Sequence, residues 1–235
     1  MVPIKTWLAG ARAQRLDSGR PLVTLSYAQS LDGCIAARRG QPLALSGKDA
    51  QVFTHTLRAA HDAILVGIGT VLADNPRLTV RWVEGRDPQP VILDSRLRFP
   101  LDANLLREGR SAPWIAILSN ANPQKRARLE AAGVRFFEIP AEANGRIHLA
   151  ALLERLGALS IDSLMVEGGA QVISAFLTAD LVDQVAITIA PVFLGGLRAV
   201  ETQQPLPMLP RLQDVGYERK GDDLVVWGKL TRGAS

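Results

Sequence analysis

Between Arg58 and Arg81 lies a glycine-rich segment whose composition could serve to bind an anion. The apolar run at residues 63–66 is long enough for a buried strand. It leads into residues 67–70 (GIGT), a predicted turn where glycine lets another group approach the backbone. Residues 74–76 (DNP) predict a polar turn. Because guanidinium groups bind phosphate through paired hydrogen bonds, the two arginines favour a nucleotide or sugar-phosphate site. The alternative is a buried strand with ordinary surface arginines.

A second candidate anion site follows the apolar run at residues 164–166. There the chain reads Glu167, Gly168 and Gly169, and a helical pattern covers residues 171–177. A strand that runs into two glycines at a helix N-terminus exposes backbone N–H groups, and the helix dipole favours an anion beside them. A pyrophosphate would suit this position. The alternative is a tight strand-to-helix turn that binds nothing.

A third candidate follows the apolar run at residues 90–93, where the chain reads Asp94, Ser95 and Arg96. Ser95 and Arg96 could bind the 2′-phosphate that distinguishes NADP from NAD. The alternative is a hairpin tip with a solvated arginine. Because open α/β sheets bind ligands at the carboxyl ends of their strands, we expect all three segments to lie at one edge of a sheet.

Several other kinds of site are excluded by the same segments. Residues 67–72 (GIGTVL) miss the Rossmann fingerprint, because Leu72 stands where a third glycine or alanine belongs. The chain has no Walker A loop and no Gly-x-Ser-x-Gly elbow. Cys34 is the only cysteine, and the three histidines are not spaced as metal ligands, so we expect no metal. We expect His55 on a helix surface and His61 at a helix-to-strand junction.

The composition predicts a globular protein that binds neither nucleic acid nor membranes. The chain has 235 residues, 47% of them hydrophobic and 21% charged, which is enough for a large core in one domain. The net charge of +4 mildly favours anionic partners, but the basic residues are scattered and aromatic residues make up only 5%. No apolar run reaches the roughly 18 residues of a membrane span. With no secretory signal either, we expect a cytoplasmic protein.

Strand and helix patterns alternate along the chain, which predicts an α/β fold. The expected sheet is mostly parallel, and an antiparallel hairpin near the C-terminus closes it. We assign residues 1–20 to a leader and residues 21–235 to a single domain. The predicted strands are residues 22–28, 63–66, 90–93, 114–118, 134–139, 164–166 and 185–189, and the predicted helices begin at residues 46, 123, 149 and 171.

The helix predicted from residue 46 has a specific start and an inner face. Ser46 is predicted to cap it, because an acid, Asp49, follows three residues later. Phe53 and Leu57 recur at helical spacing on the buried stripe. Arg58 lies beside that stripe, so we expect it to lean over a site without being buried itself.

Taken together, the motifs resemble those of the pyrimidine reductase of riboflavin biosynthesis, a family with a dihydrofolate-reductase-like fold and helices on both faces of the sheet. The resemblance covers roughly residues 21–230. Many bacterial members carry a zinc deaminase domain whose His-x-Glu and Pro-Cys-x-x-Cys motifs are absent here, so the resemblance implies a stand-alone reductase. The motifs that carry it are residues 30–33 (SLDG), 70–81 (TVLADNPRLTVR), 94–95 (DS), 167–169 (EGG), 189–191 (IAP) and 194–196 (LGG).

The resemblance implies that NADPH reduces a ribosylaminopyrimidine 5′-phosphate to its ribityl product, and that the enzyme is a homodimer. By position it implies that Arg58, Leu78, Arg81 and Glu167 face the substrate. Asp32 and Glu167 are the candidate proton donors. Together with the anion sites derived above, the expected cofactor-binding residues are Ala28, Thr70, Asp74, Ser95, Arg96, Gly168, Gly169, Ala170, Gln171 and Val172.

Two positions depart from the family pattern. Bacterial members commonly carry a serine and then a tryptophan where this chain has Pro42 and Ala44. This departure leaves open a reductase of the same fold for another imine or a pterin. A non-catalytic nucleotide-binding module is a further alternative, although binding a cofactor would not by itself require both arginines and Glu167. As candidate dimer interfaces we expect the apolar strand at residues 185–189, as an uncovered edge, and the C-terminal hairpin.

Overall fold

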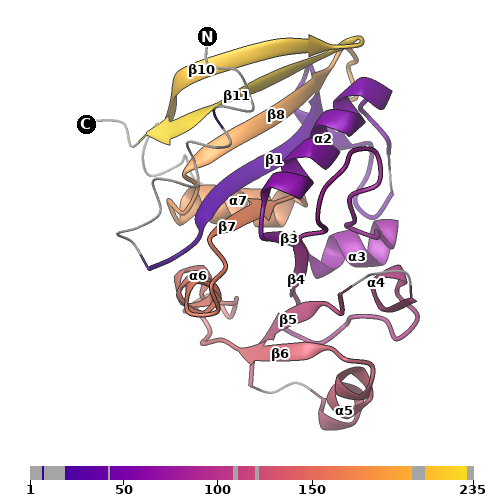
Figure 1. Ribbon diagram of the computed structural model, residues 1–235, viewed down its shortest axis with the longest axis vertical. Coiled ribbons are helices and arrows are strands. Elements are labelled where there is room, and N and C mark those ends of the chain that lie inside the picture. Colours follow the sequence, from indigo (N-terminus) through magenta and orange to yellow (C-terminus); the bar gives the residue numbers. More distant parts are fainter. Residues whose placement is uncertain are drawn as a thin grey trace.

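A nine-stranded sheet runs through the whole molecule, with helices packed on either side of it (Figure 1). This computed structural model describes Trp7 and residues 19–41, 43–107, 111–119, 122–202 and 210–231, so most of the predicted leader lies outside the described residues. The helices are α2 (Lys48–Ala60), α3 (Ile68–Asp74), α4 (Asn104–Arg107), α5 (Pro123–Ala131), α6 (Leu149–Gly157) and α7 (Ala170–Thr178). The strands are β1 (Leu22–Ser30), β2 (Cys34–Ala36), β3 (Ala63–Gly67), β4 (Gln89–Leu93), β5 (Trp114–Ile117), β6 (Arg135–Glu138), β7 (Ser163–Val166), β8 (Gln184–Ala190), β9 (Leu197–Arg198), β10 (Arg211–Lys220) and β11 (Asp223–Thr231).

The large sheet has the strand order β10-β11-β8-β1-β7-β3-β4-β5-β6. Every pairing from β8 to β6 is parallel, whereas β11 pairs antiparallel with both β8 and β10. The predicted mostly parallel sheet with an antiparallel C-terminal hairpin is therefore confirmed. From β3 the chain moves outward to β6, and it then returns to insert β7 between β1 and β3.

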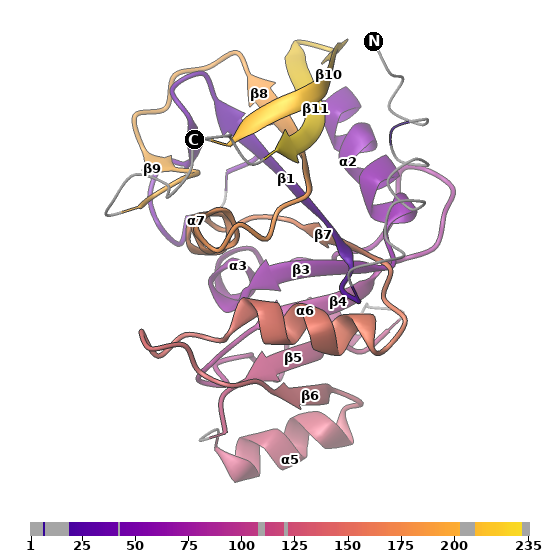
Figure 2. The same cartoon turned by 90° about the vertical axis from the view of Figure 1, so that its left-hand side faces the viewer.

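Both faces of the sheet are covered, which explains the continuous apolar run in β3. Ala63 and Leu65 face one core and Ile64 and Val66 face the other, and all four are fully buried. A strand buried on both faces loses the usual alternation of polar and apolar residues. The first core lies under α6 and α7, which stand in the foreground of Figure 2, and the second lies under α2, α3, α4 and α5.

Helix α2 does not begin as predicted. Its N-cap is Gly47, which makes no side-chain capping bond, so the prediction that Ser46 caps the helix is wrong. The Gly47 N–H instead donates to Asp223 Oδ2 at 2.7 Å, 176 residues further along the chain at the start of β11. The tip of the C-terminal hairpin therefore supplies the acceptor for the N-cap N–H, which in a capping box comes from the third residue of the helix.

The edges of the sheet also differ from expectation. We expected residues 185–189 to form an uncovered edge, but β8 pairs with β1 on one side and with β11 on the other. That prediction is wrong, because the C-terminal hairpin covers β8, and the edge strands of this sheet are β10 and β6. Val215 and Tyr217 on β10 are exposed. In the described part of the chain, no helix is long and apolar enough to cross a membrane.

Replacing Asp223 tests whether the hairpin tip stabilises α2. Asp223→Ala should lower the free energy of unfolding by about 1 kcal/mol, because it removes the acceptor at the start of the helix. Urea unfolding measures the change. Asp222→Ala is the matched control, since the Asp222 side chain is 89% exposed. Equal stability of the two variants would contradict the role of Asp223.

Candidate active site

The strand order reverses beside β1, and this creates a switch point in the sheet. β1 pairs with β7 as far as Leu25 and Val166, but it pairs with β8 as far as Ser30 and Ala190. β1 therefore continues past the carboxyl end of β7, and Ala28 lies on this extension. Open α/β sheets bind ligands at such switch points, outside the carboxyl ends of the strands.

The three segments expected to bind a ligand meet at this edge. The Glu167 N–H, just beyond β7, donates to the Leu65 carbonyl of β3 at 2.9 Å. Gly67, at the end of β3, is in register with Leu93, at the end of β4, and Asp94 follows directly. The prediction that these segments share one edge of the sheet is confirmed.

Gly168 and Gly169 join β7 to α7 through a turn that only glycine adopts readily. Their φ angles are +86° and +84°, and Gly169 is the N-cap of α7. A Cβ at Gly169 would lie 3.1 Å from Thr70 Oγ1, so Thr70 is close to this turn. A Cβ at Gly168 would meet nothing within 4 Å, so there is room beside its Cα, although the residue itself is buried. The first helical turn after Gly169 contains Ala170, Gln171 and Val172.

The predicted glycine turn at residues 67–70 is wrong. Gly67 ends β3, and α3 begins at Ile68 without an intervening loop. Gly67 is required by packing, because a Cβ there would lie 2.8 Å from Val172 Cγ2. The first turns of α3 and α7 are thus packed together. The predicted polar turn is present, since Asn75 ends α3 in the left-handed region at φ 41°.

A partly buried ion pair joins α2 to the turn after β7. Arg58 Nε donates to Glu167 Oε2 at 2.8 Å, and Arg58 Nη2 donates to Glu167 Oε1. Arg58 Nη1 also donates to the Thr79 carbonyl at 3.2 Å. Arg58 is only 9% exposed, so the expectation that it is not buried is wrong. Burial is tolerated because the Glu167 carboxylate compensates the charge with two hydrogen bonds.

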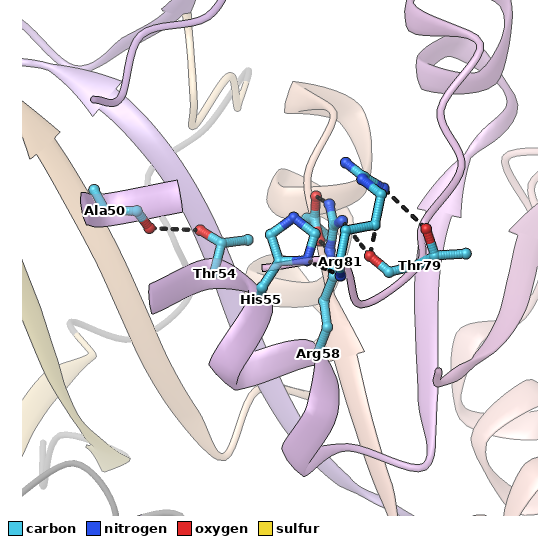
Figure 3. Close-up of polar contacts among 7 residues, drawn as sticks. Ala50, Thr54, His55, Arg58, Thr79 and Arg81 are labelled. Atoms are coloured by element: carbon cyan, nitrogen blue, oxygen red, sulfur yellow. Dashed lines mark hydrogen bonds and ion pairs between the residues drawn. The ribbon is translucent and has the colours of Figure 1, made fainter. Parts of the chain in front are cut away.

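Arg81 lies beside this pair and is more accessible (Figure 3). Its backbone N–H donates to His55 Nδ1 at 3.0 Å, and its Nη1 donates to Thr79 Oγ1 at 2.9 Å. Partial burial and the positive charges of Arg58 and Arg77 lower the pKa of Arg81. At Arg81 the positive charges of Arg58 and Arg77 outweigh the negative charges of Glu167 and Asp87, which favours an anionic ligand there.

The side chain of Leu78 is buried, and its predicted place beside the substrate stays a prediction. The resemblance placed it against the substrate, but the side chain is 2% exposed and belongs to the core that also contains Leu57 and Val71. Its φ of 55° lies in the left-handed region, which is uncommon for a residue of this type. The structure places Leu78 in the core, where it fixes the path of the loop that carries Arg81.

His55 is a residue of the site that the sequence pattern missed. It is 4% exposed and stacks on Trp82, with ring centroids 5.2 Å apart, so the prediction of a surface histidine is wrong. Burial, together with the charges of Arg58 and Arg81, lowers the pKa of His55 to about 4. Neutral His55 accepts the Arg81 N–H at Nδ1, so its own proton is on Nε2. By contrast, His61 lies at the predicted junction of α2 and β3.

The acids near the site differ in their protonation. Asp32 accepts hydrogen bonds from Ser30 Oγ and from the N–H groups of Leu194 and Gly195, and these bonds lower its pKa. Asp32 is therefore ionised and anchors a loop, which argues against the suggested role as a proton donor. Burial, and then the charge of Glu167, raise the pKa of Asp74. Asp74 retains a proton to higher pH than an ordinary aspartate.

The predicted residues that follow β4 lie at the same edge. Ser95 and Arg96 form the turn after β4, with Arg96 exposed, so a role in phosphate binding stays a prediction. Asp94 is fully buried, and its Oδ2 accepts the Phe99 N–H at 2.8 Å.

Ala44 is exposed, and Pro42 lies outside the described residues. Among the residues that the structure covers, no cluster of histidine, cysteine and acidic side chains could hold a metal ion.

Comparisons with known proteins identify the class to which this fold and site belong. The family model described as the RibD C-terminal domain matches residues 21–226. The chain therefore belongs to the RibD C-terminal domain family, and the resemblance to the riboflavin-pathway reductases is confirmed.

Individual relatives agree with this family. The chain is 34% identical to the 2,5-diamino-6-ribosylamino-4(3H)-pyrimidinone 5′-phosphate reductase of Candida glabrata, over 91% of each chain. It is 36% identical to the reductase of the same name from Archaeoglobus fulgidus, over 91% of this chain and all of that one. The solved structure of the riboflavin biosynthesis reductase Rib7 of Saccharomyces cerevisiae superposes with a TM-score of 0.74, at 32% identity over 97% of each chain. The expected fold class is confirmed by this similarity.

The depressed pKa of His55 predicts how stability changes with pH. The native state holds His55 neutral down to about pH 4, whereas the unfolded chain protonates it near the ordinary value of 6.5. Its contribution to stability is thus complete above pH 6.5 and declines as pH falls toward 4. At pH 5 we expect a loss of about 2 kcal/mol relative to pH 8. Urea unfolding of the protein and of His55→Asn across this range isolates the effect, and parallel pH curves would contradict it.

Proposed function

We propose that this protein is the NADPH-dependent reductase that converts 2,5-diamino-6-ribosylamino-4(3H)-pyrimidinone 5′-phosphate to its ribityl product in riboflavin biosynthesis. The observation that carries the proposal is the arginine cluster with the Arg58–Glu167 pair beside the switch point. The names of the Candida glabrata and Archaeoglobus fulgidus relatives favour the diamino-pyrimidinone, so we place the reaction before deamination. Assembly as a homodimer and a cytoplasmic location belong to the proposal.

The switch point suits a dinucleotide. The room beside the Gly168 Cα would let a pyrophosphate reach the N–H groups at the start of α7. Thr70 and Ala28 flank this position, and Ser95 and Arg96 would bind the 2′-phosphate. NADPH, when bound, supplies the hydride that reduces C1 of the ribosyl group. The protein residues bind and orient both molecules.

The substrate phosphate fits the arginine cluster. The Arg81 side chain is exposed, whereas three of the N–H groups of Arg58 are already bonded to Glu167 and Thr79. We infer that Arg81 contacts the 5′-phosphate directly and that Arg58 contributes its charge while it holds Glu167 in place. A module that only bound a nucleotide would have no use for this second anion site.

Asp74, the acid with a raised pKa, is the candidate proton donor. Reduction of the opened ribosyl group adds one hydride to C1 and one proton to the adjoining heteroatom, so a protonated group must lie nearby. Asp74 has a raised pKa, whereas Asp32 is kept ionised by its hydrogen bonds. Both oxygens of Glu167 already accept hydrogen bonds from Arg58.

Turnover with purified substrates tests the proposal. Oxidation of NADPH should proceed with the diamino-pyrimidinone phosphate and much more slowly with its deaminated amino-uracil counterpart. NADH should be the poorer reductant, because it lacks the phosphate for Ser95 and Arg96. Turnover with the amino-uracil alone would place the reaction after deamination. Reduction of neither compound would contradict the proposal and favour another imine or a pterin.

Arg81→Ala tests the phosphate site. The variant should raise the KM for the phosphorylated substrate by roughly 10- to 100-fold, the value expected for a charged hydrogen-bonding partner. The dissociation constant for NADPH, measured by fluorescence titration, should change less than twofold. Arg219→Ala is the matched control, because the Arg219 side chain is 76% exposed at the tip of the β10–β11 hairpin. An equal loss of substrate and NADPH affinity would show that Arg81 does not bind the phosphate.

A further inference from the structure

Residues 75–82, here called the arginine loop, are held in place by side chains from outside the loop. No residue of the loop belongs to a helix or strand. At its start, the Asn104 N–H donates to Asn75 Oδ1 at 2.8 Å, and Asn104 Nδ2 donates to the Asn75 carbonyl at 2.7 Å. These two bonds attach the beginning of the loop to α4.

Three consecutive residues at the far end of the loop are fixed in the same way. The Thr79 carbonyl accepts a hydrogen bond from Arg58, and the Val80 N–H donates to Asp87 Oδ1 at 2.7 Å. The Arg81 N–H donates to His55 Nδ1 at 3.0 Å. Of these contacts, the one to His55 is made by Arg81, whose side chain is exposed.

The surroundings of His55 suit a neutral acceptor. Arg58 on α2 and Arg81 on the loop repel a second positive charge, whereas Glu167 and Asp87 attract one more weakly. Burial is the largest cause of the lowered pKa of His55 and the arginines add to it, so the imidazole is neutral over the range in which enzymes usually operate. Trp82 stacks on the ring and limits its rotation.

We propose that His55 is a positioning residue that acts through the Arg81 backbone to direct the Arg81 guanidinium toward the substrate phosphate. This inference rests on the proposed function, in which Arg81 binds that phosphate. His55 itself is 4% exposed and takes no direct part in the reaction. A protonated His55 would lose the acceptor at Nδ1 and add a positive charge beside two arginines.

Two substitutions separate the acceptor from the ring. His55→Phe keeps a ring that can stack on Trp82 but removes the acceptor, whereas His55→Asn keeps an acceptor oxygen near the position of Nδ1 but removes the ring. His55→Phe should raise the KM for the phosphorylated substrate roughly three- to tenfold, with kcat and NADPH affinity within twofold of the wild type. His55→Asn should restore most of the loss. Equal defects in the two variants would overturn the inference.

A double-mutant cycle tests whether His55 acts through Arg81. In the Arg81→Ala background, His55→Phe should change the KM less than twofold, because the guanidinium that it positions is already absent. An additive loss would show that His55 acts elsewhere. His148→Asn is the matched control, since His148 caps α6 and is exposed, and it should leave the KM unchanged. Hydrogen exchange at the Arg81 amide should become faster in His55→Phe, and unchanged protection would contradict the contact.

Binding of ribose 5-phosphate separates this inference from the proposed function. Calorimetry should show weaker binding to His55→Phe than to the wild type. If the wild type binds ribose 5-phosphate but reduces neither pyrimidine, the proposed function fails while the role of His55 stands. If His55→Phe binds it as tightly as the wild type, the role of His55 fails. A wild type that does not bind it would overturn the inference, because no phosphate site would exist.

Discussion

The ion pair between Arg58 and Glu167 is the contact on which the arrangement of the site depends. The two residues are 109 positions apart in the chain, and their paired hydrogen bonds fix α2 against the turn that follows β7. Arg58 also holds the Thr79 carbonyl, so the same guanidinium reaches the arginine loop. A buried charge is costly when its partner is lost, so this pair restricts α2, the β7–α7 turn and the loop to one relative placement.

The topology of the sheet explains why these segments can meet. Because β7 is inserted between β1 and β3, the two glycine-containing strand ends become neighbours, and α3 and α7 start side by side. Any side chain at Gly67 or Gly169 would press on Val172 or Thr70, so close packing determines both glycines. At the same edge there is room beside the Gly168 Cα, where an added Cβ would meet nothing within 4 Å.

The charged groups around the site have different roles because their surroundings differ. Asp32 is ionised by the donors around it and anchors a loop, Glu167 is paired with an arginine, and Asp74 is shifted toward its protonated form. His55 is held neutral among positive charges. Side chains of the same type thus acquire different chemistry because burial and neighbouring charges differ from one position to the next.

Local sequence patterns predict the structure correctly where it depends on residues that are close together in the chain. The sequence predicts three such features: the buried strand at residues 63–66, the helix start at Asn122 and Pro123, and the two glycines before α7. Each reflects packing or capping within a few residues. The residues 70–81 motif also indicated the family before any contact was known.

Only the tertiary structure decided the burial of His55 and Arg58, the capping of α2 by Asp223 and the interior position of β8. Helical periodicity predicts which face of a helix packs on the sheet. It does not predict that a loop from elsewhere in the chain covers the adjacent face. These features depend on groups that are brought together by the crossing order of the strands. The strand order depends on how much apolar surface the whole sheet buries, and a short segment of sequence does not determine that.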